Sequence, residues 1–287
     1  MSLIMDSRRA QQVGRLLLDA FRGDGIFGRT FMPAHLLPRG VDRGSRAHLH
    51  FVTLTTAINY MRDADALWEA SRRTYEAPQT HYLYTPRQVA QTDTDKLIAD
   101  MKRYRLARKP NKDADIWQTI CITLTRHFNG DVYNLLERAN FDAPLVLATI
   151  RDRRYQFPYL KGPKTGSLWI RVLEDRWQGH HLENLDRVPI PVDVHIAAAT
   201  VMTGCVRGPF DGPFSKLRDA VTEVWFSACQ GSSLYALLFN DPLWHLSRQG
   251  CRKTRGFPCE YRNQCPVARH CTETRLVKDG SRASIAA

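Results

Sequence analysis

The sequence is poor in acidic residues and has no apolar run long enough to span a membrane. Its 287 residues hold 29 Asp and Glu against 41 Lys and Arg, which gives a net charge of +12. Such a surplus is most simply explained by a polyanionic partner such as nucleic acid, although a basic enzyme without such a partner would also carry it. The first residues do not follow the basic-then-apolar order of a signal peptide. We therefore expect a cytoplasmic protein without a membrane partner.

The sequence also lacks sustained strand alternation and internal repeats. Apolar residues recur instead at helical spacing. The helical candidates are residues 13–21, 45–68, 95–104, 113–128, 132–139, 168–173 and 197–202. A stretch rich in Gly and Pro, residues 23–44, interrupts the pattern. The predicted fold class is mostly α, and the length suffices for one large domain or two smaller ones.

Four cysteines fall close together near the end of the sequence, in the order C-x7-C-x5-C-x5-C. They are Cys251, Cys259, Cys265 and Cys271. Four thiolates at this density can hold a zinc ion or a [4Fe–4S] cluster. Structural zinc sites usually take ligands in pairs two to four residues apart, and no such pair occurs here, so the spacing favours the larger iron–sulfur cluster. Two disulfides or four buried thiols would also account for cysteines at these positions.

A glycine-bearing turn runs directly into an apolar helix at residues 160–167, Leu-Lys-Gly-Pro-Lys-Thr-Gly-Ser. A turn of this kind exposes backbone N–H groups at the positive end of the helix dipole, which suits a phosphate. Lys161 and Lys164 would add positive charge there. The same residues would equally form an ordinary turn before a helix.

A second segment, residues 188–196, approaches a helix of small residues through two prolines and places Asp193 at the helix N-cap. A carboxylate at a helix start is held rigidly and kept ionised by the helix dipole. Asp193 is therefore a candidate catalytic carboxylate, unless it only caps the helix.

Taken in order, these parts resemble the helix-hairpin-helix (HhH-GPD) DNA glycosylase superfamily, in particular its endonuclease III-like members with a C-terminal four-cysteine iron–sulfur loop. Two further segments carry the resemblance. Residues 103–136, with the helix start Lys112-Asp113 and the turn over 127–132, look like the segment before the hairpin. Residues 53–60 look like the helix and loop that border a flipped base. The resemblance covers about residues 45–271.

The resemblance implies a two-lobed helical fold. Residues 45–175 would form a six-helix lobe containing the helix-hairpin-helix element. Residues 1–44 and 176–287 would form the second helical lobe, with the cluster loop at 251–271. It also implies a monomer that binds double-stranded DNA at the nucleoid, and a [4Fe–4S] cluster on the four cysteines.

The resemblance further implies roles for single residues. Asp193 would stabilise the oxocarbenium character of the sugar during base release, and Lys164 would form a Schiff base in a lyase reaction. Aligned with a two-residue deletion, the hairpin puts Lys164 at the Schiff-base position; without a gap, Gly166 takes it. The expected DNA-binding residues are Lys161, Gly162, Gly166 and Arg255, and the expected base-pocket residues are Asn59 and Tyr60.

Three functions follow from these features. The first is a base-excision enzyme that flips a modified or mismatched base and cleaves its N-glycosidic bond. The second is a phage-type transferase on the same scaffold, which adds an amine or amino acid to activated 5-hydroxymethyluracil in DNA. The third is a non-catalytic iron–sulfur DNA-binding protein, for which a carboxylate such as Asp193 beside the phosphate site would be unnecessary.

Overall fold

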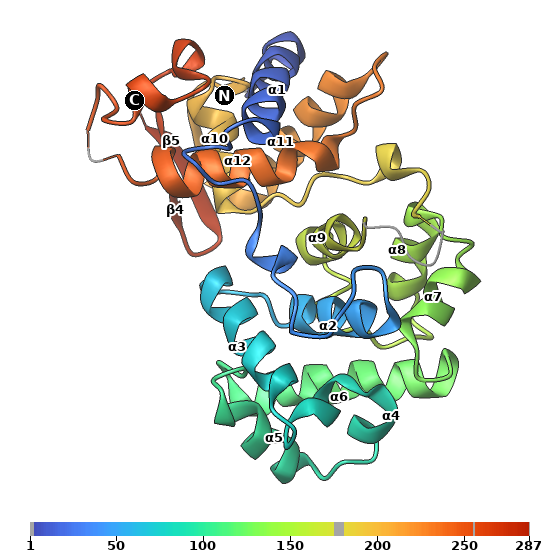
Figure 1. Ribbon diagram of the computed structural model, residues 1–287. Coiled ribbons are helices and arrows are strands. Elements are labelled where there is room, and N and C mark those ends of the chain that lie inside the picture. The colour runs from blue at the N-terminus through green and yellow to red at the C-terminus, as the bar shows by residue number, and fades with distance from the viewer. Residues whose placement is uncertain (1–2, 175–180, 255, 287) are drawn as a thin grey trace. The chain divides into compact units, whose positions relative to one another are not determined.

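The computed structural model describes residues 3–174, 181–254 and 256–286, and helices dominate them (Figure 1). This confirms the mostly α fold class. The chain divides into two compact units: a terminal unit, Met1–Phe31 with Val188–Ala287, and a central unit, Met32–Arg187. The boundaries expected from the sequence lie at 44/45 and 175/176. No helix in the described ranges is both long and apolar enough to cross a bilayer.

The central unit is built from helices whose starts are marked in the sequence. Its helices are α2 (Arg46–Ala57), α3 (Ala64–Glu76), α4 (Pro86–Val89), α5 (Thr94–Arg103), α6 (Pro110–His127), α7 (Val132–Arg138), α8 (Ala143–Arg151) and α9 (Pro163–Leu173). Short 3-10 turns lie at Pro33–His35, His81–Tyr84 and Leu185–Arg187. Side chains that accept a hydrogen bond from a first-turn amide cap five of these helices, and they are Ser45, Asp63, Asp93, Asp131 and Asp142. Short polar side chains at these positions satisfy amides that the helix itself leaves unbonded.

Two buried tryptophans fix the core of the central unit. The Trp117 indole of α6 donates to the Leu83 carbonyl at 2.7 Å, and the Trp169 indole of α9 donates to Thr53 Oγ1 of α2 at 2.8 Å. Both tryptophans are fully buried. Because a buried indole N–H needs an acceptor, these bonds set the positions of α6 and α9 while the rings fill the core.

The terminal unit joins the two ends of the chain. Its helices are α1 (Ser7–Arg22), α10 (Val194–Met202), α11 (Phe214–Cys229) and α12 (Asn240–Leu246), and α12 continues into a π-helical turn, Ser247–Cys251. Helix α1 packs against α11 and α12. This packing needs glycine at position 14 of α1, because a Cβ there would lie 2.6 Å from Cε1 of Phe239, the residue before α12. The buried Trp225 indole donates to Thr200 Oγ1 at 2.9 Å and holds α11 against α10.

Strands also occur in the terminal unit, where the sequence shows no sustained alternation. Strand β1 (Ile4–Met5) pairs antiparallel with β2 (Val206–Arg207). Strands β3 (Phe210–Pro213), β4 (Arg275–Asp279) and β5 (Arg282–Ala286) form an antiparallel sheet in the order β3-β5-β4. Four- and five-residue strands that are largely exposed need few apolar residues, so they leave no alternating signal.

Candidate functional site

The turn that leads into α9 belongs to a helix-hairpin-helix arrangement formed by α8, residues 152–162 and α9. Gly162 is the N-cap of α9, and among the described residues no side chain caps this helix start. The Gly162 amide donates to the Tyr159 carbonyl at 3.0 Å, and Tyr159 adopts a φ of 61°. Arg151, at the end of α8, donates through Nε to the Lys161 carbonyl at 3.4 Å. The predicted turn-to-helix step is confirmed, and α9 begins five residues earlier than its apolar segment indicates.

The two lysines and the second glycine of this turn occupy different environments. Lys161 is exposed, whereas Lys164 is half-buried in the first turn of α9. Gly166 is buried, and a Cβ there would lie 3.1 Å from both Leu147 Cδ2 and the Leu160 carbonyl oxygen. Position 166 therefore packs α9 against the hairpin and α8, while Lys164 is the lysine that the helix start presents.

Asp193 stands at the N-cap of α10, as the sequence predicts. Its Oδ1 accepts hydrogen bonds from the amides of His195 at 2.8 Å and Ile196 at 3.0 Å. The side chain is half-buried. The neighbouring His195 contacts Ser247 Oγ through Nδ1 at 3.3 Å, and its ring packs edge-on to Trp244. Asp193 belongs to the terminal unit, whereas Lys164 belongs to the central unit.

Tyr60 is fixed by a buried carboxylate. Its hydroxyl donates to Asp113 Oδ1, and Asp113 Oδ2 accepts from the amides of Arg108 at 2.7 Å and Lys109 at 2.9 Å. Burial, followed by the bond to Asp113, raises the pKa of Tyr60. The ring stacks on Tyr159 with centroids 4.5 Å apart. Tyr60 thus connects the end of α2 to the hairpin before α9.

The two residues that flank Tyr60 differ from it. Asn59 is half-buried, and its amide donates to the Thr56 carbonyl at 3.0 Å. Met61, in contrast, is 77% exposed and has a φ of 49°. The next residue, Arg62, donates through Nη1 to the Leu106 carbonyl at 2.7 Å.

Met61 is therefore a flexible apolar side chain on a loop that is fastened on both sides. A positive φ is uncommon for methionine and signals a conformation that the surroundings impose. From the sequence, Met61 counts among the apolar residues of a buried helix or helix pair over residues 45–68, whereas the structure places it, largely exposed, in the loop between α2 and α3.

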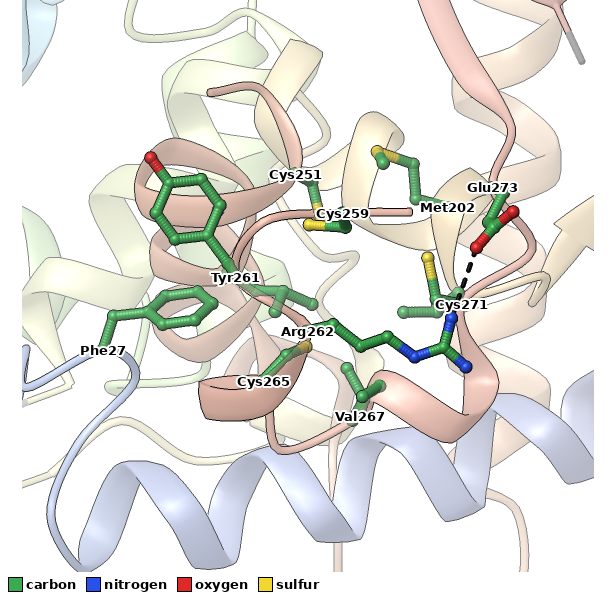
Figure 2. Close-up of a pocket in the computed structure, with 14 residues that line it drawn as sticks. Phe27, Met202, Cys251, Cys259, Tyr261, Arg262, Cys265, Val267, Cys271 and Glu273 are labelled. Atoms are coloured by element: carbon green, nitrogen blue, oxygen red, sulfur yellow. Dashed lines mark hydrogen bonds and ion pairs between the residues drawn. The ribbon is translucent and has the colours of Figure 1, made fainter. Parts of the chain in front are cut away.

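The four C-terminal cysteines line one pocket in the terminal unit (Figure 2). Phe27, Met202, Leu246 and Val267 supply apolar walls to it. All seven cysteines of the chain are free, so the two disulfides considered from the sequence are not formed. Burial raises the pKa of the Cys251 thiol, and the neighbouring Cys265, Cys271 and Cys259 raise it further. Burial likewise raises the pKa of Cys265 to about 11.

The two metal sites considered from the sequence differ in how their ligands meet. Within residues 3–174, 181–254 and 256–286, no three His, Cys, Asp or Glu side chains come together as a site for one metal ion. A zinc ion needs four ligands at about 2.3 Å from one point, whereas the thiolates around an iron–sulfur cluster bind different irons. The four thiols line one pocket, and the [4Fe–4S] cluster stays a prediction.

The basic segment between the first two cysteines is described except at one position. Arg255, an expected DNA-binding residue, lies outside the described residues. The surrounding residues Lys253 and Gly256 are described, and the Lys253 amide donates to the Gly250 carbonyl at 2.8 Å. The expectation for Arg255 stays a prediction.

Comparison with known proteins identifies the fold class. No family model matches the chain, and no curated protein matches it. Among solved structures, those that match it include DNA glycosylases, and the chain has a helix-hairpin-helix glycosylase fold.

Three of these structures are particular complexes or enzymes. A trapped covalent intermediate of endonuclease III with DNA, an estranged-adenine complex, matches with a TM-score of 0.55 and 16% identity over 92% of this chain and 96% of that one. A non-covalent endonuclease III–DNA complex matches with a TM-score of 0.52 and 15% identity, over 92% of this chain and 95% of that one. A thermostable thymine-DNA glycosylase matches with a TM-score of 0.52 and 14% identity, over 92% of this chain and 98% of that one. At these identities the likeness establishes the fold.

Proposed function

We propose that the protein binds double-stranded DNA and removes a modified or mismatched base by cleaving its N-glycosidic bond. The observation that carries the proposal is the start of α9, where no described side chain forms a cap and Lys164 lies in the first turn, on a glycosylase scaffold. Amides at such a helix start are suited to bind a backbone phosphate. Gly162 allows the backbone to approach the phosphate, Gly166 allows α9 to pack on the hairpin, and Lys161 and Arg255 add charge.

Asp193 is the proposed catalytic carboxylate. During base release the C1′–N bond breaks with its electron pair on the base, and positive charge develops on the sugar. A carboxylate held by two amide hydrogen bonds at the start of α10 is pre-organised to stabilise that charge. The same carboxylate can accept a proton from an attacking water, whose oxygen then bonds to C1′.

Lys164 offers a second route to base release. Its Nζ, once neutral, bonds to C1′ while the base leaves with the electron pair and takes a proton. Opening of the sugar ring then leaves an imine between C1′ and Nζ. Because Gly166 is enclosed by Leu147 and Leu160, Lys164 is the residue of the hairpin that we assign to this role.

The loop after α2 is the proposed border of the flipped base. Asn59 and the fixed ring of Tyr60 would line the base pocket. We propose that Met61 fills the space that the flipped base leaves in the base stack, because an exposed apolar side chain can insert between base steps. Flipping costs a few kcal/mol, and the cost is lowest for damaged or mispaired bases.

Cys251, Cys259, Cys265 and Cys271 are the proposed ligands of a [4Fe–4S] cluster. When bound, the cluster would supply covalent cross-links that order the C-terminal loop. The pocket that the four cysteines share, with its apolar walls, supports this assignment. We propose that this loop positions the basic segment against DNA, and that the protein acts as a monomer in the cytoplasm at the nucleoid.

A panel of duplexes tests the proposal. Each would carry one lesion: uracil, thymine opposite guanine, 8-oxoguanine, an oxidised pyrimidine or 5-hydroxymethyluracil. The proposal expects base release from at least one duplex, detected as an alkali-labile site. If every duplex stays intact while the protein still binds DNA, base excision is contradicted, and the transferase or the non-catalytic binding protein takes its place.

A further inference from the structure

A second basic site lies on the terminal unit, between α1 and the part of the cysteine loop that holds Arg269 and His270. Helix α1 contributes Gln12, Arg15 and Leu16, and the 3-10 turn Ala268–His270 contributes Arg269 and His270. Together they line an open hollow of about 450 Å³. The lining holds two guanidinium groups, an imidazole and an amide, and none of the described residues adds a carboxylate to it.

The two walls of this hollow are fastened to each other by a third arginine. Arg9, on α1, donates through Nε to the Thr203 carbonyl at 2.6 Å and through Nη2 to the His270 carbonyl at 2.7 Å. The Thr272 amide donates to the Met202 carbonyl at 2.9 Å and holds the following residues against α10. The hollow is therefore a fixed feature, and the Arg9 guanidinium is occupied by backbone carbonyls.

The two arginines that line the hollow differ from Arg9 in their contacts. Within the described residues, neither Arg15 nor Arg269 forms an ion pair or a side-chain hydrogen bond, and both are exposed. Two guanidinium groups with unused donors, carried by two walls that Arg9 holds together, favour an anion with several oxygens. Planar guanidinium groups match phosphate oxygens in pairs, and the Gln12 amide adds a further donor.

We propose that this hollow binds a phosphate group. The group can come from the DNA backbone or from a free phosphate compound such as pyrophosphate. The DNA source rests on the proposed function, whereas the phosphate site does not. If the source is DNA, the hollow adds a backbone contact separate from the start of α9.

The test uses a double variant and a matched control. Arg15→Gln with Arg269→Gln removes both charges from the hollow. Arg22→Gln with Lys216→Gln removes two exposed charges of the same unit that do not line it. All four side chains are exposed, so neither double variant should shift the melting temperature appreciably. Thermal melting of the full-length variants checks this.

Two binding measurements distinguish the sources. Fluorescence anisotropy with an undamaged duplex over a series of salt concentrations reports contacts to DNA, and calorimetric titration with pyrophosphate reports a free phosphate. A DNA source predicts that the hollow variant binds the duplex more weakly, with a log–log salt slope shallower by about 0.9 per lost phosphate contact. A free source predicts that pyrophosphate binds the wild type and the control but not the hollow variant.

The proposal is overturned if the hollow variant matches the wild type in both measurements, or if the control loses as much binding as the hollow variant. Neither measurement involves base release. If the protein released no base from any duplex, the proposed function would be contradicted, but the two binding measurements would still test the phosphate site.

Discussion

Asp193 combines a structural and a proposed catalytic duty, and one substitution separates them. Asparagine caps helices about as well as aspartate, so Asp193→Asn should keep α10 and the melting temperature. Base release should fall by about 10²- to 10⁴-fold, because the carboxylate charge and its ability to accept a proton are lost. Duplex affinity should stay equal or rise, since one repulsion from the phosphates is removed.

Single-turnover assays and anisotropy on the same lesion duplex measure both quantities. Asp93→Asn is the matched control, because Asp93 caps α5 through the same kind of amide bonds and has no proposed catalytic role. If Asp193→Asn released base at the wild-type rate, Asp193 would be only a cap.

Lys164 decides whether the protein cleaves the strand after base release. If its amine forms the imine, borohydride should trap the wild type on lesion DNA as a covalent complex, and Lys164→Ala should give none. Lys102→Ala is the control, since it removes an exposed charge from the same unit at a residue with no proposed role in DNA binding or catalysis. If Lys164→Ala were still trapped, another amine would form the imine. If the wild type were not trapped, the enzyme would release the base and leave an abasic site.

At the residue scale the sequence predicted positions better than contacts. Asp193 at a helix cap could be recognised because prolines and small residues frame it. The bond from Tyr60 to Asp113 could not, because the two residues meet only through the packing of α2 against α6. Gly166 has a packing role beside Leu147 and Leu160 that spacing alone does not reveal, and its expected contact with DNA stays a prediction.

The loop between α2 and α3 makes a prediction at the scale of elements. Met61→Ala should leave the melting temperature unchanged, because the side chain is 77% exposed. It should reduce base release from a paired lesion more than from the same lesion in single-stranded DNA, since only the duplex needs its gap filled.

Leu145→Ala provides a control for the loss of an exposed apolar side chain, because Leu145 is 50% exposed on α8. Equal rates for Met61→Ala and the wild type on the paired lesion would rule out the wedge role.

The cysteine loop makes a second prediction at this scale. The protein, purified without air, should be brown, absorb near 400 nm and contain about four irons per chain. Cys265→Ser should lose iron and unfold at a lower temperature, because the metal closes the loop. Cys229 lies outside the pocket, so Cys229→Ser should keep both the iron content and the unfolding temperature of the wild type. Colourless protein with one zinc per chain would contradict the cluster.

Helices with marked starts and one apolar face were the elements that the sequence predicted. The segments 45–68, 113–128 and 132–139 correspond to α2 with α3, α6 and α7. Helices α8 and α11 were not identified. Their helical period is no weaker than that of α2 and α6, so the sequence carried a signal for both that was missed. The sheet of β3, β4 and β5 was missed because its strands are short and largely exposed.

At the scale of the whole molecule, acid stability should depend on Asp131. Burial alone would raise its pKa, but contacts with His50, the Tyr133 amide and Arg46 outweigh burial and lower the pKa from 3.8 to about 2. A lowered pKa in the folded state stabilises the fold above the unfolded value of 3.8, and that stabilisation disappears as the pH falls toward 2.

Asp131→Asn should therefore cost roughly 1 to 2 kcal/mol at pH 6 and almost nothing near pH 2. Urea unfolding at several pH values measures the difference. Asp142→Asn is the control, because Asp142 caps α8 without a cationic partner in the described part of the chain. A cost for Asp131→Asn that stayed constant down to pH 2 would contradict the role of the charge.

The terminal unit is built from two segments that are far apart in the sequence, and this has a consequence for biosynthesis. Helix α1 is made before the central unit, but its packing partners α11 and α12 leave the ribosome only after the whole of that unit. The central unit can complete its own core while the apolar side of α1, which includes Val13, Leu17 and Leu18, has nothing to cover it. A pause in translation before residue 240 would prolong that exposure, so we expect α1 to be the segment that chaperones protect on the nascent chain.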